Sequence, residues 1–368
     1  MSAHTGLGRR PREVLTVLLV LAVLAAISGV LVRWTAADRG AATGAAAAPR
    51  TPQDAQPTGW MSDTALQGFA QGTLGGQGGT LREVTTLADS GVGSLREALA
   101  AGGPSWIRFL VSGAIVLGQP LEVPSQTTID GRGADVTLEN KGLIIDGTSN
   151  IIVENLKFTA IHGATSDALS VRNGAHDVWI DHDDFSNGSD GLVDITLGAT
   201  DVTVSWCHFF NHDKTMLISA LTSTAPMHVT VHHNWFDHTN QRNPLVRDAY
   251  AHVYDNYVDG FGSYGMQAQE GGYLLSQHNV LRAVLGSQET DGIRITDNKH
   301  GAGVVRAEDD LLLDGATQLV RLSGLLHPVP YRFVLEPAGP RLEAEITVGS
   351  GWRAFPGSTS SAPPLPIA

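Results

Sequence analysis

The amino-acid sequence predicts an all-β fold, a right-handed parallel β-helix in which short strands coil and stack on themselves. One observation is a repeated pattern in which small apolar residues alternate with polar ones and a bulky apolar residue closes the unit. Such alternation, rich in Val, Ile and Thr, is typical of strands. The pattern occurs as NIIVENLKF (150–158), DVWIDHDDF (177–185), DVTVSWCHF (201–209), HVTVHHNWF (228–236), HVYDNYV (252–258), YLLSQHNVL (273–281) and GIRITDNKH (292–300).

The spacing of these units is the second observation. Equivalent positions lie 19 to 27 residues apart, which is the period of a solenoid. No helix of ten or more residues fits between successive units, so a doubly wound α/β fold is disfavoured. A leucine-rich repeat lacks its Leu pattern here, and the period is too short for a β-propeller. The equivalent position often holds Asn, which fits left-handed turns or a side-chain amide ladder; it falls at Leu156, Asp183, Cys207, Asn234, Asn256, Asn279 and Asn298.

Composition agrees with this fold and narrows the function. The 42 glycines and 17% charged residues among 368 suit a turn-rich β protein. A net charge of -13 argues against nucleic acid or an anionic membrane surface as partner, so a polyanionic ligand would need a local cationic site. The single cysteine, Cys207, excludes an internal disulfide, and its place on a repeat strand predicts a small buried side chain.

The N-terminal region predicts export. Arg9, Arg10 and Arg12 precede 19 uncharged residues (14–32), and Arg33 follows. This charge order places the N-terminus in the cytoplasm and the rest outside. We therefore expect residues 1–33 to be a signal peptide or membrane anchor and the protein to be extracellular, secreted or anchored to the outer side of the cell membrane. Residues 34–62, rich in Ala, Gly, Pro and Thr, predict a disordered linker.

Residues 63–356 predict the β-helix domain, and we expect it to be monomeric. Within it, the Gly-rich stretch 68–99 predicts a short strand at 81–84 and a short helix near 94–100 that caps the solenoid. Stretches 107–117 and 127–148 continue as strands and turns. Residues 332–352 predict a packed C-terminal segment, and 357–368 a disordered tail.

Three aspartates form a candidate metal site. Val178 and Ile180 should point inward, so Asp181 should project outward. Asp190 and Asp194 follow in the loop of the same coil. Three carboxylates repel one another unless a cation joins them, and oxygen ligands in an exported protein favour Ca²⁺ over Mg²⁺ or Zn²⁺. Solvated turn aspartates remain the alternative.

Three cations follow in the next coils. Lys214 comes after HD, and Arg242 and Arg247 belong to QRNPLVR, where Pro244 restricts the backbone between them. Stacked coils are about 4.8 Å apart, so acids and bases at similar phase would line one groove. Arginine matches a carboxylate as a two-pronged donor. Ordinary surface ion pairs are the alternative.

These residues also carry a resemblance to a known family. The chain from about 68 to 352 resembles the pectate lyases of polysaccharide lyase family 1 through GGQGG with DSGVGSLREAL, TIDGRGADVTL, VWIDH, SDGLVD, HDKTMLI, and QRNPLVR followed by HVYDNY. Ser219 stands where the family usually has Gly. The resemblance implies a calcium-dependent lyase acting on polygalacturonate or pectin, an acidic polysaccharide. It implies Ca²⁺ ligands at Asp181, Asp190 and Asp194, with Asp184 as a candidate further ligand, substrate contacts from Lys214 and Arg247, and a catalytic base at Arg242.

The implied reaction is a β-elimination. The proton on C5 of a 1,4-linked galacturonan lies α to the C6 carboxylate, and the leaving oxygen is on C4. The product is a 4,5-unsaturated oligogalacturonide. Arginine ordinarily keeps its proton in proteins, so Arg242 as the base would need a site that favours the neutral form, and an alkaline optimum would fit.

Other functions remain open on the residues alone. Asp183 and Asp184 could imitate the acid and base of a β-helical polygalacturonase, which hydrolyses the same polymer. A non-catalytic pectin-binding surface protein is a third reading, against which the retained Lys214, Arg242 and Arg247 argue. A pectin lyase needs no bridging cation and is disfavoured by the aspartates. The sequence contains many histidines but no HExxH motif. We therefore expect them to be structural and to stack between coils, with His182 in that role beside the calcium site.

Overall fold

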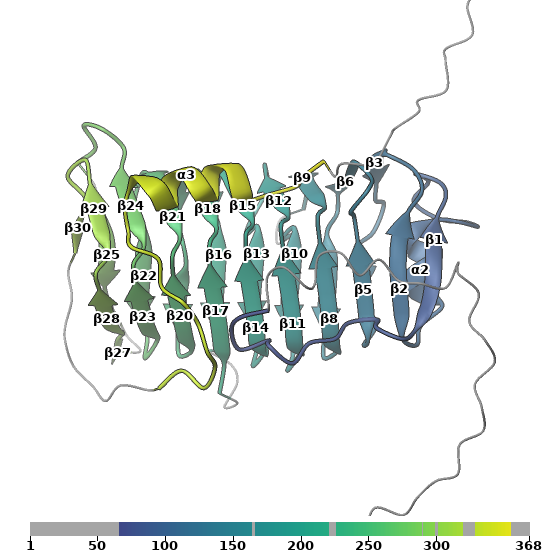
Figure 1. Cartoon of the computed structure of the whole chain (residues 1–368), viewed down its shortest axis with the longest axis horizontal. Coiled ribbons are helices and arrows are strands. Elements are labelled where there is room, and N and C mark those ends of the chain that lie inside the picture. The colour runs from purple at the N-terminus through teal and green to yellow at the C-terminus, as the bar shows by residue number, and fades with distance from the viewer. Residues whose placement is uncertain are drawn as a thin grey trace, which may run out of the picture. The chain divides into compact units, whose positions relative to one another are not determined.

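The fold was examined in a computed structural model that describes residues 66–163, 166–220, 226–288, 290–298, 301–318 and 328–354. Its strands form three long sheets, A, B and C, and successive coils contribute one strand to each sheet in turn (Figure 1). Pairing between neighbouring coils is parallel; the antiparallel exceptions are β27 with β22 and with β26. The predicted parallel β-helix is confirmed, and residues 1–33, 34–62 and 357–368 lie outside the described ranges.

The strand bounds follow the order of each sheet. Sheet A contains β1 (Thr80–Val84), β2 (Ser105–Phe109), β5 (Thr127–Asp130), β8 (Ser149–Glu154), β11 (His176–Asp181), β14 (Thr200–Ser205), β17 (His228–His232), β20 (Tyr250–Tyr254), β23 (Tyr273–Gln277) and β28 (Val304–Glu308). Sheet B contains β3 (Gly113–Val116), β6 (Val136–Asn140), β9 (Lys157–Ile161), β12 (Asp184–Ser186), β15 (His208–Lys214), β18 (Trp235–Gln241), β21 (Tyr257–Phe261), β24 (Val280–Ala283) and β29 (Leu311–Leu313). Sheet C contains β4 (Leu121–Glu122), β7 (Leu143–Asp146), β10 (Leu169–Arg172), β13 (Val193–Thr196), β16 (Met216–Ser219), β19 (Leu245–Arg247), β22 (Met266–Gln269), β25 (Asp291–Ile295), β26 (Asp297–Asn298), β27 (Gly301–Ala302) and β30 (Thr317–Gln318).

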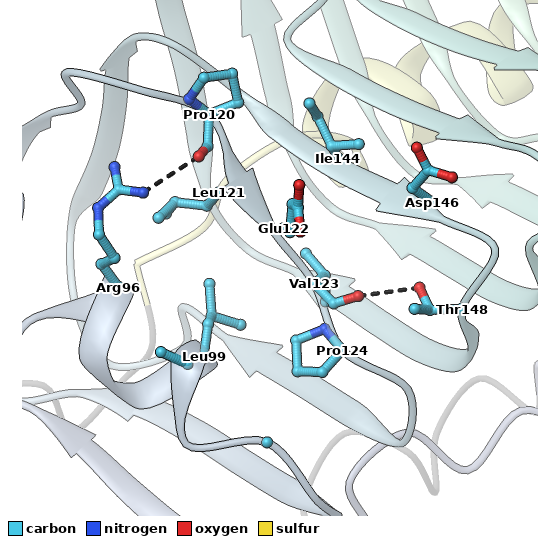
Figure 2. Close-up of a pocket in the computed structure, with 12 residues that line it drawn as sticks. Arg96, Leu99, Pro120, Leu121, Glu122, Val123, Pro124, Ile144, Asp146 and Thr148 are labelled. Carbon is cyan, nitrogen blue, oxygen red and sulfur yellow. Dashed lines mark hydrogen bonds between the residues drawn. The ribbon is translucent and has the colours of Figure 1, made fainter.

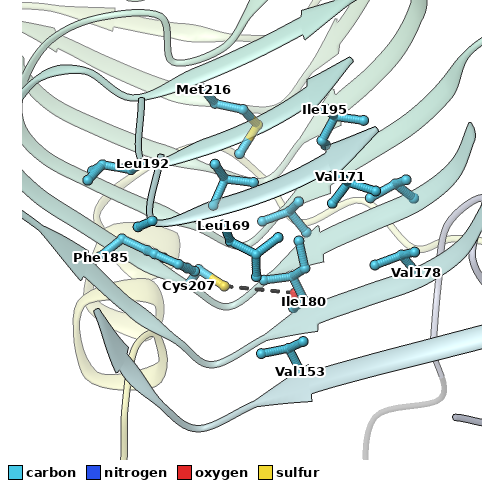
Figure 3. Packing of buried hydrophobic residues seen from close by; sticks show 14 of the residues in the cluster. Val153, Leu169, Val171, Val178, Ile180, Phe185, Leu192, Ile195, Cys207 and Met216 are labelled. Carbon is cyan, nitrogen blue, oxygen red and sulfur yellow. Dashed lines mark hydrogen bonds between the residues drawn. The ribbon is translucent and has the colours of Figure 1, made fainter. Parts of the chain in front are cut away.

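The core fills the inside of the coil. Alternate residues of the strands point inward and stack on their equivalents one coil away, as Figure 3 shows for Val153 with Ile180 and for Val171 with Ile195. A column of phenylalanines continues this stacking, with successive ring centroids 4.8, 5.1 and 5.0 Å apart; it consists of Phe158, Phe185, Phe209 and Phe236. Cys207 lies fully buried in the same core, so it is the packed small side chain that its strand position predicts.

The recurrent Asn position forms the predicted amide ladder. Asn256 Oδ1 accepts from the backbone N–H and the Nδ2 of Asn234, at 2.9 and 3.0 Å. Asn279 Oδ1 accepts from the N–H and Nδ2 of Asn256 in the same way, at 2.9 Å each. The left-handed backbone is adopted by the residue before each Asn, such as His233 and Asp255. The ladder therefore ties the bend between sheets A and B of one coil to the next.

We expect Asn256→Ala to lower the free energy of unfolding by about 2–3 kcal/mol. Asn256 is fully buried, and its Nδ2 also donates to the carbonyl oxygens of Val231 and Tyr254. Alanine would leave these groups and the N–H of Asn234 without partners. Urea unfolding should show the loss, whereas Gln119→Ala at an exposed position should stay within about 0.5 kcal/mol. Equal stability of the two variants would contradict a structural ladder.

Two helices lie at the edges of the solenoid. Helix α2 (Leu95–Ala100) begins after Ser94, whose Oγ accepts from the Glu97 N–H, and buries Leu95 and Leu99 at the N-terminal end. It matches the predicted short helix. Helix α3 (Pro340–Gly349) lies along sheet B (Figure 1) and packs Leu342 and Ile346 against Tyr257 and Val280. The packed C-terminal segment is thus helical; its β-branched residues Ile346, Thr347 and Val348 disguise the helix in the sequence.

The first described residues of the chain cover sheet A, and helix α3 covers sheet B. Residues 66–79 cross the outer face of sheet A, where the N–H groups of Phe69, Ala70 and Gly76 donate to the hydroxyls of Thr230, Thr203 and Thr128. Outward residues of sheet C such as Ser170, Asp194 and Leu217 are only half-buried. Sheet C therefore offers its side chains to a ligand.

No helix within the described ranges is both long and apolar enough to cross a bilayer. The apolar stretch 14–32 lies outside those ranges, so its predicted role stays a prediction.

Candidate functional site

The outer face of sheet C orders its side chains in rows that run along the solenoid. The strand register pairs each residue with its equivalent one coil away, and this gives an outer row of Glu122, Ile144, Ser170, Asp194 and Leu217. A parallel row, closer to the C-terminal ends of the strands, contains Ser219, Arg247 and Gln269. Neighbours within a row are separated by about 4.8 Å, the spacing between strands.

Three carboxylates converge where the chain enters β10 and β13. They belong to Asp167, Asp190 and Asp194, which we call the acidic cluster. The Gly191 N–H donates to Asp167 Oδ1 at 3.0 Å. A Cβ added to Gly191 would lie 2.4 Å from Asp194 Oδ1 and 2.9 Å from Asp167 Oδ1. Glycine is therefore required here, because any side chain would push the two carboxylates apart.

Burial and mutual repulsion act on these acids. Burial raises the pKa of Asp194 to about 8, and the charge of Asp167 adds to the rise, while Arg242 opposes it. Burial also raises the pKa of Asp167, with Asp190 contributing and Ser170 and Gly191 opposing through hydrogen bonds. The cluster therefore holds negative charge at a free-energy cost that a bound cation would relieve.

Lys214 and His212 position Asp190 from the next coil. Lys214 Nζ lies 3.2 Å from Asp190 Oδ1, and His212 Nε2 lies 2.7 Å from the Asp190 carbonyl oxygen. Both come from β15, and both line a polar pocket of about 470 Å³ with Asn187, Asn211 and Asn240. Lys214 thus lies beside the acidic cluster and also lines a pocket whose walls carry amide and carboxylate groups.

Arg242 lies one coil after Lys214, in the link between β18 and β19. Its backbone is left-handed, with φ of 63°. Its carbonyl oxygen accepts from the Met216 N–H of the preceding coil at 2.8 Å, which fixes the backbone at this position. Arg242 acts electrostatically on both Asp167 and Asp194. Its Nε is buried without a hydrogen-bond acceptor in the described part of the chain. The guanidinium therefore lies close to the acidic cluster, and its side chain also interacts with Tyr264.

Arg247 and Arg294 extend the cationic side of the groove. With the Gln269 amide oriented so that its oxygen faces Arg247, that oxygen accepts from Arg247 Nη2 at 2.7 Å. Arg294 stacks on the ring of buried Tyr264, with Cζ 4.0 Å from the ring centroid. Burial raises the pKa of Tyr264, although the charges of Arg242, Arg294 and Arg247 oppose the rise. Three guanidinium groups thus gather around one tyrosine.

The structure does not bring Asp181 to this cluster, which corrects the predicted ligand set. Asp181 ends β11 in sheet A, whereas Asp194 belongs to sheet C. Its side chain does point away from the core, but it is only 1% exposed. Asp181 accepts from Ser205 Oγ at 2.5 Å and lies 2.6 Å from His182 Nδ1. It is a member of a buried polar network, so the expectation of an outward carboxylate beside Asp190 is wrong.

Asp183 and Asp184 do not form the acid and base of a hydrolase. Asp183 is fully buried and accepts from the Leu156 N–H at 2.7 Å. Asp184 lies on sheet B, where it accepts from the Trp352 N–H at 3.1 Å. Asp183 stabilises the bend between sheets A and B, and Asp184 stabilises the C-terminal segment. Asp184 lies on sheet B, whereas the acidic cluster lies at sheet C.

Asp167 is the residue that the sequence analysis missed. It reaches the cluster because β10 pairs with β13 so that Ser170 lies beside Asp194. A signal existed in the sequence: Ser-Asp-Ala-Leu at 166–169 resembles Ser-Asp-Gly-Leu at 189–192, one coil later. Aligning the coils on this pair instead of on the strand before it would have placed Asp167 next to Asp190.

The histidines are mostly structural. His182, Trp206 and His233 stack through successive coils, with ring centroids 5.8 and 4.5 Å apart. His232 stacks on Tyr254 at 4.9 Å. His212 differs, because it contacts the backbone of Asp190. The predicted stacking between coils is confirmed for these residues, and His182 stands beside Asp181 rather than beside the acidic cluster.

The acidic cluster suits a hard divalent cation in the chemistry of its donors. Three carboxylates with no nitrogen or sulfur ligand are the donor set that Ca²⁺ prefers. Burial, and after it the repulsion between carboxylates, raises the pKa values of Asp167 and Asp194, and such a cation would offset both effects. Across the described residues, no three His, Cys, Asp or Glu side chains lie close enough together to hold a metal ion by themselves. Asp167, Asp190 and Asp194 would therefore hold the ion together with oxygens from a substrate or water.

Comparison with known proteins identifies the family. The sequence model of the family described as pectate lyase matches residues 117–303. Pectate lyase 1 of Ambrosia artemisiifolia is 38% identical over 240 residues, which are 58% of this chain and 60% of that relative, so the chain spans less than two thirds of its length. Pectate lyase 1 of Juniperus virginiana is 35% identical over 61% of this chain and 68% of that protein.

Two solved structures share the fold. The crystal structure of Jun a 1, the major allergen from cedar pollen, superposes with a TM-score of 0.69 and 28% identity, covering 78% of this chain and 92% of that one. A pectate lyase from Bacillus sp. N165 in complex with trigalacturonate has a TM-score of 0.62 and 22% identity, covering 78% and 98%.

Proposed function

This chain belongs to the pectate lyase family of polysaccharide lyases, and from that premise we propose that it cleaves 1,4-linked galacturonan by calcium-dependent β-elimination. One observation carries the proposal: Asp167, Asp190 and Asp194 converge on the open face of sheet C, next to Lys214 and Arg242. A chain of galacturonate residues presents carboxylates at regular intervals, and a groove with acids, a cation site and guanidinium groups is complementary to it. The relative solved with trigalacturonate supports this substrate class.

Each residue has a role in this proposal. Calcium on the acidic cluster would neutralise a substrate carboxylate and so make the neighbouring C5 proton more acidic. Lys214 and Arg247 would hold carboxylates of the chain, Lys214 as a compact point charge and Arg247 as a two-pronged donor. Arg242, between them, would take the proton from C5. The C4–O bond then breaks, the electron pair leaves with the glycosidic oxygen, and a C4–C5 double bond forms.

The position of Arg242 supports its role as the base. Arg242 acts electrostatically on Asp167 and Asp194, and with Arg247 and Arg294 it acts on Tyr264, so it stands beside the acidic cluster. A guanidinium ordinarily stays protonated. High pH favours its neutral form, so the activity should rise toward alkaline pH.

Where this reaction takes place follows from the substrate and the N-terminal sequence. Pectic polymers lie outside cells, and the uncharged stretch 14–32 after Arg9, Arg10 and Arg12 fits export or anchoring. We propose an extracellular protein, secreted or anchored to the outer side of the cell membrane, that acts as a monomer on its polymer.

Elimination on polygalacturonate tests the proposal. Each cleavage creates a double bond conjugated to a carboxylate, so ultraviolet absorbance should grow with time. EDTA should stop this growth, and added Ca²⁺ should restore it. Reducing ends without absorbance would instead show hydrolysis, and binding without turnover would show a pectin-binding protein; either result would reject the lyase.

A further inference from the structure

A second hollow lies on the same sheet face as the acidic cluster. It has a volume of about 610 Å³ and is bounded by α2, β4 and β7 (Figure 2). We call it the end pocket; its residues include Arg96, Pro120, Glu122, Ile144, Asp146 and Thr148. Glu122 and Ile144 also belong to the outer row that contains Asp194. Because strands are spaced by about 4.8 Å, Ile144 lies roughly 10 Å and Glu122 roughly 14 Å from Asp194 along the groove.

The charges of the end pocket differ from those of the acidic cluster and its cations. Its one lining cation, Arg96, is already engaged: it contacts Asp89 Oδ1 at 2.6 Å and the carbonyl oxygens of Gln119 and Pro120 at 2.8 and 3.2 Å. Asp146 accepts from Arg172 Nε at 2.9 Å. Glu122 is exposed, and no cation in the described ranges forms an ion pair with it. The end pocket therefore presents a carboxylate with no available cation.

This arrangement discriminates between charged and uncharged sugars. A galacturonate residue in the end pocket would bring its carboxylate close to Glu122, where like charges repel. A methyl ester of the same sugar carries no charge, and its methyl group can pack on half-buried Ile144 and Pro120. Both properties of the end pocket, its charge and its apolar surface, favour the ester.

We propose that the end pocket is a specificity subsite that accepts a methyl-esterified galacturonate, distant from the bond that is cleaved. This proposal rests on the proposed function, since it assumes that a galacturonan lies along sheet C. The enzyme would then cleave blocks of free galacturonate next to an ester, because the sugars at the acidic cluster must carry carboxylates and the sugar in the end pocket must not.

The test compares the wild type with Glu122→Gln and Glu122→Lys on polygalacturonate and on pectins of increasing methylation. Sequencing of the products by mass spectrometry shows where esters lie relative to the new unsaturated or reducing end. For the wild type we expect esters enriched at one fixed position a few sugars from that end. Glu122→Gln should reduce this enrichment and raise kcat/KM on polygalacturonate about two- to fivefold, the range for one exposed charge contact, and Glu122→Lys should raise it further.

Glu139→Gln is the matched control, because Glu139 lies on β6 of sheet B, away from the groove. It should leave the product pattern and the rates as in the wild type. An unbiased ester distribution in wild-type products would overturn the subsite, and so would a bias that both Glu122 variants retain. If the wild type eliminates none of these polymers, the proposed function itself fails. Elimination without any effect of Glu122 refutes the end-pocket subsite and leaves the lyase standing.

Discussion

Arg242→Lys should lower kcat for elimination on polygalacturonate by about 10²–10⁴-fold at neutral pH, the range for losing a positioned base. Lysine keeps a positive charge, but it cannot reproduce a planar group whose Nε is buried and whose side chain reaches Tyr264. KM should change far less than kcat, because Lys214 and Arg247 remain to hold the substrate. Initial rates of absorbance growth across neutral and alkaline pH measure both.

Two controls separate this role from general effects of charge. Arg108→Lys, at a half-buried position of sheet A where Arg108 pairs with Glu83, should leave the rates unchanged. Arg247→Lys should act mainly on KM, because its guanidinium is proposed to bind and not to react. Near-wild-type kcat for Arg242→Lys at neutral pH would reject Arg242 as the base, and the calcium site would then need another proton acceptor.

The gathering of these charged side chains could be predicted from the sequence, because residues at the same place in successive repeats become neighbours in a solenoid. Lys214 ends β15 of sheet B, and the next coil places Arg242 in the link to sheet C and Arg247 on β19 of sheet C. The same logic explains the amide ladder of Asn234, Asn256 and Asn279, because equal places in the repeat become stacked neighbours. Periodicity is therefore the strongest signal in this chain.

Asp181 shows what the repeat pattern cannot predict. Alternation in β11 does say that Asp181 points away from the core, and it does. Alternation does not say which of the three sheets a strand joins, nor whether another segment covers that sheet. Residues 66–79 cover much of sheet A, and Arg353 acts on Asp181 from the C-terminal segment. A short separation in sequence did not predict closeness in space, because one coil passes through all three sheets within about 25 residues.

Helix α3 and Asp167 illustrate two other limits. The sequence 340–349 combines Pro at the first turn with β-branched residues near the end, so local propensity for helix and strand conflicts. Contact with Tyr257 and Val280 on sheet B decides the outcome. Asp167 was missed for a different reason: its role shows only when Ser-Asp-Ala-Leu at 166–169 is aligned with Ser-Asp-Gly-Leu in the next coil, where Gly191 and Asp194 complete the cluster.

Asp167→Asn and Asp181→Asn should therefore have opposite consequences, which we expect to be large. Asp167→Asn removes one of three charges from the acidic cluster and should weaken calcium affinity on the order of 100-fold, because affinity follows ligand charge. Without calcium its free energy of unfolding should hardly fall, since the substitution relieves the burial of a charge and the repulsion that together raise the pKa values of Asp167 and Asp194. Titration calorimetry with Ca²⁺ and urea unfolding in EDTA measure the two quantities.

Asp181→Asn should keep calcium affinity and lose stability. The buried carboxylate accepts from Ser205 Oγ and contacts His182 Nδ1, and an amide would place an N–H group against one of these partners. We expect the free energy of unfolding to fall by about 1–3 kcal/mol, with kcat per folded molecule unchanged. If Asp181→Asn instead abolished calcium binding while Asp167→Asn did not, the ion would have to lie at sheet A, under residues that leave a polysaccharide no access. The calcium affinity and the free energy of unfolding of these two variants thus show where the metal binds, without any measurement of turnover.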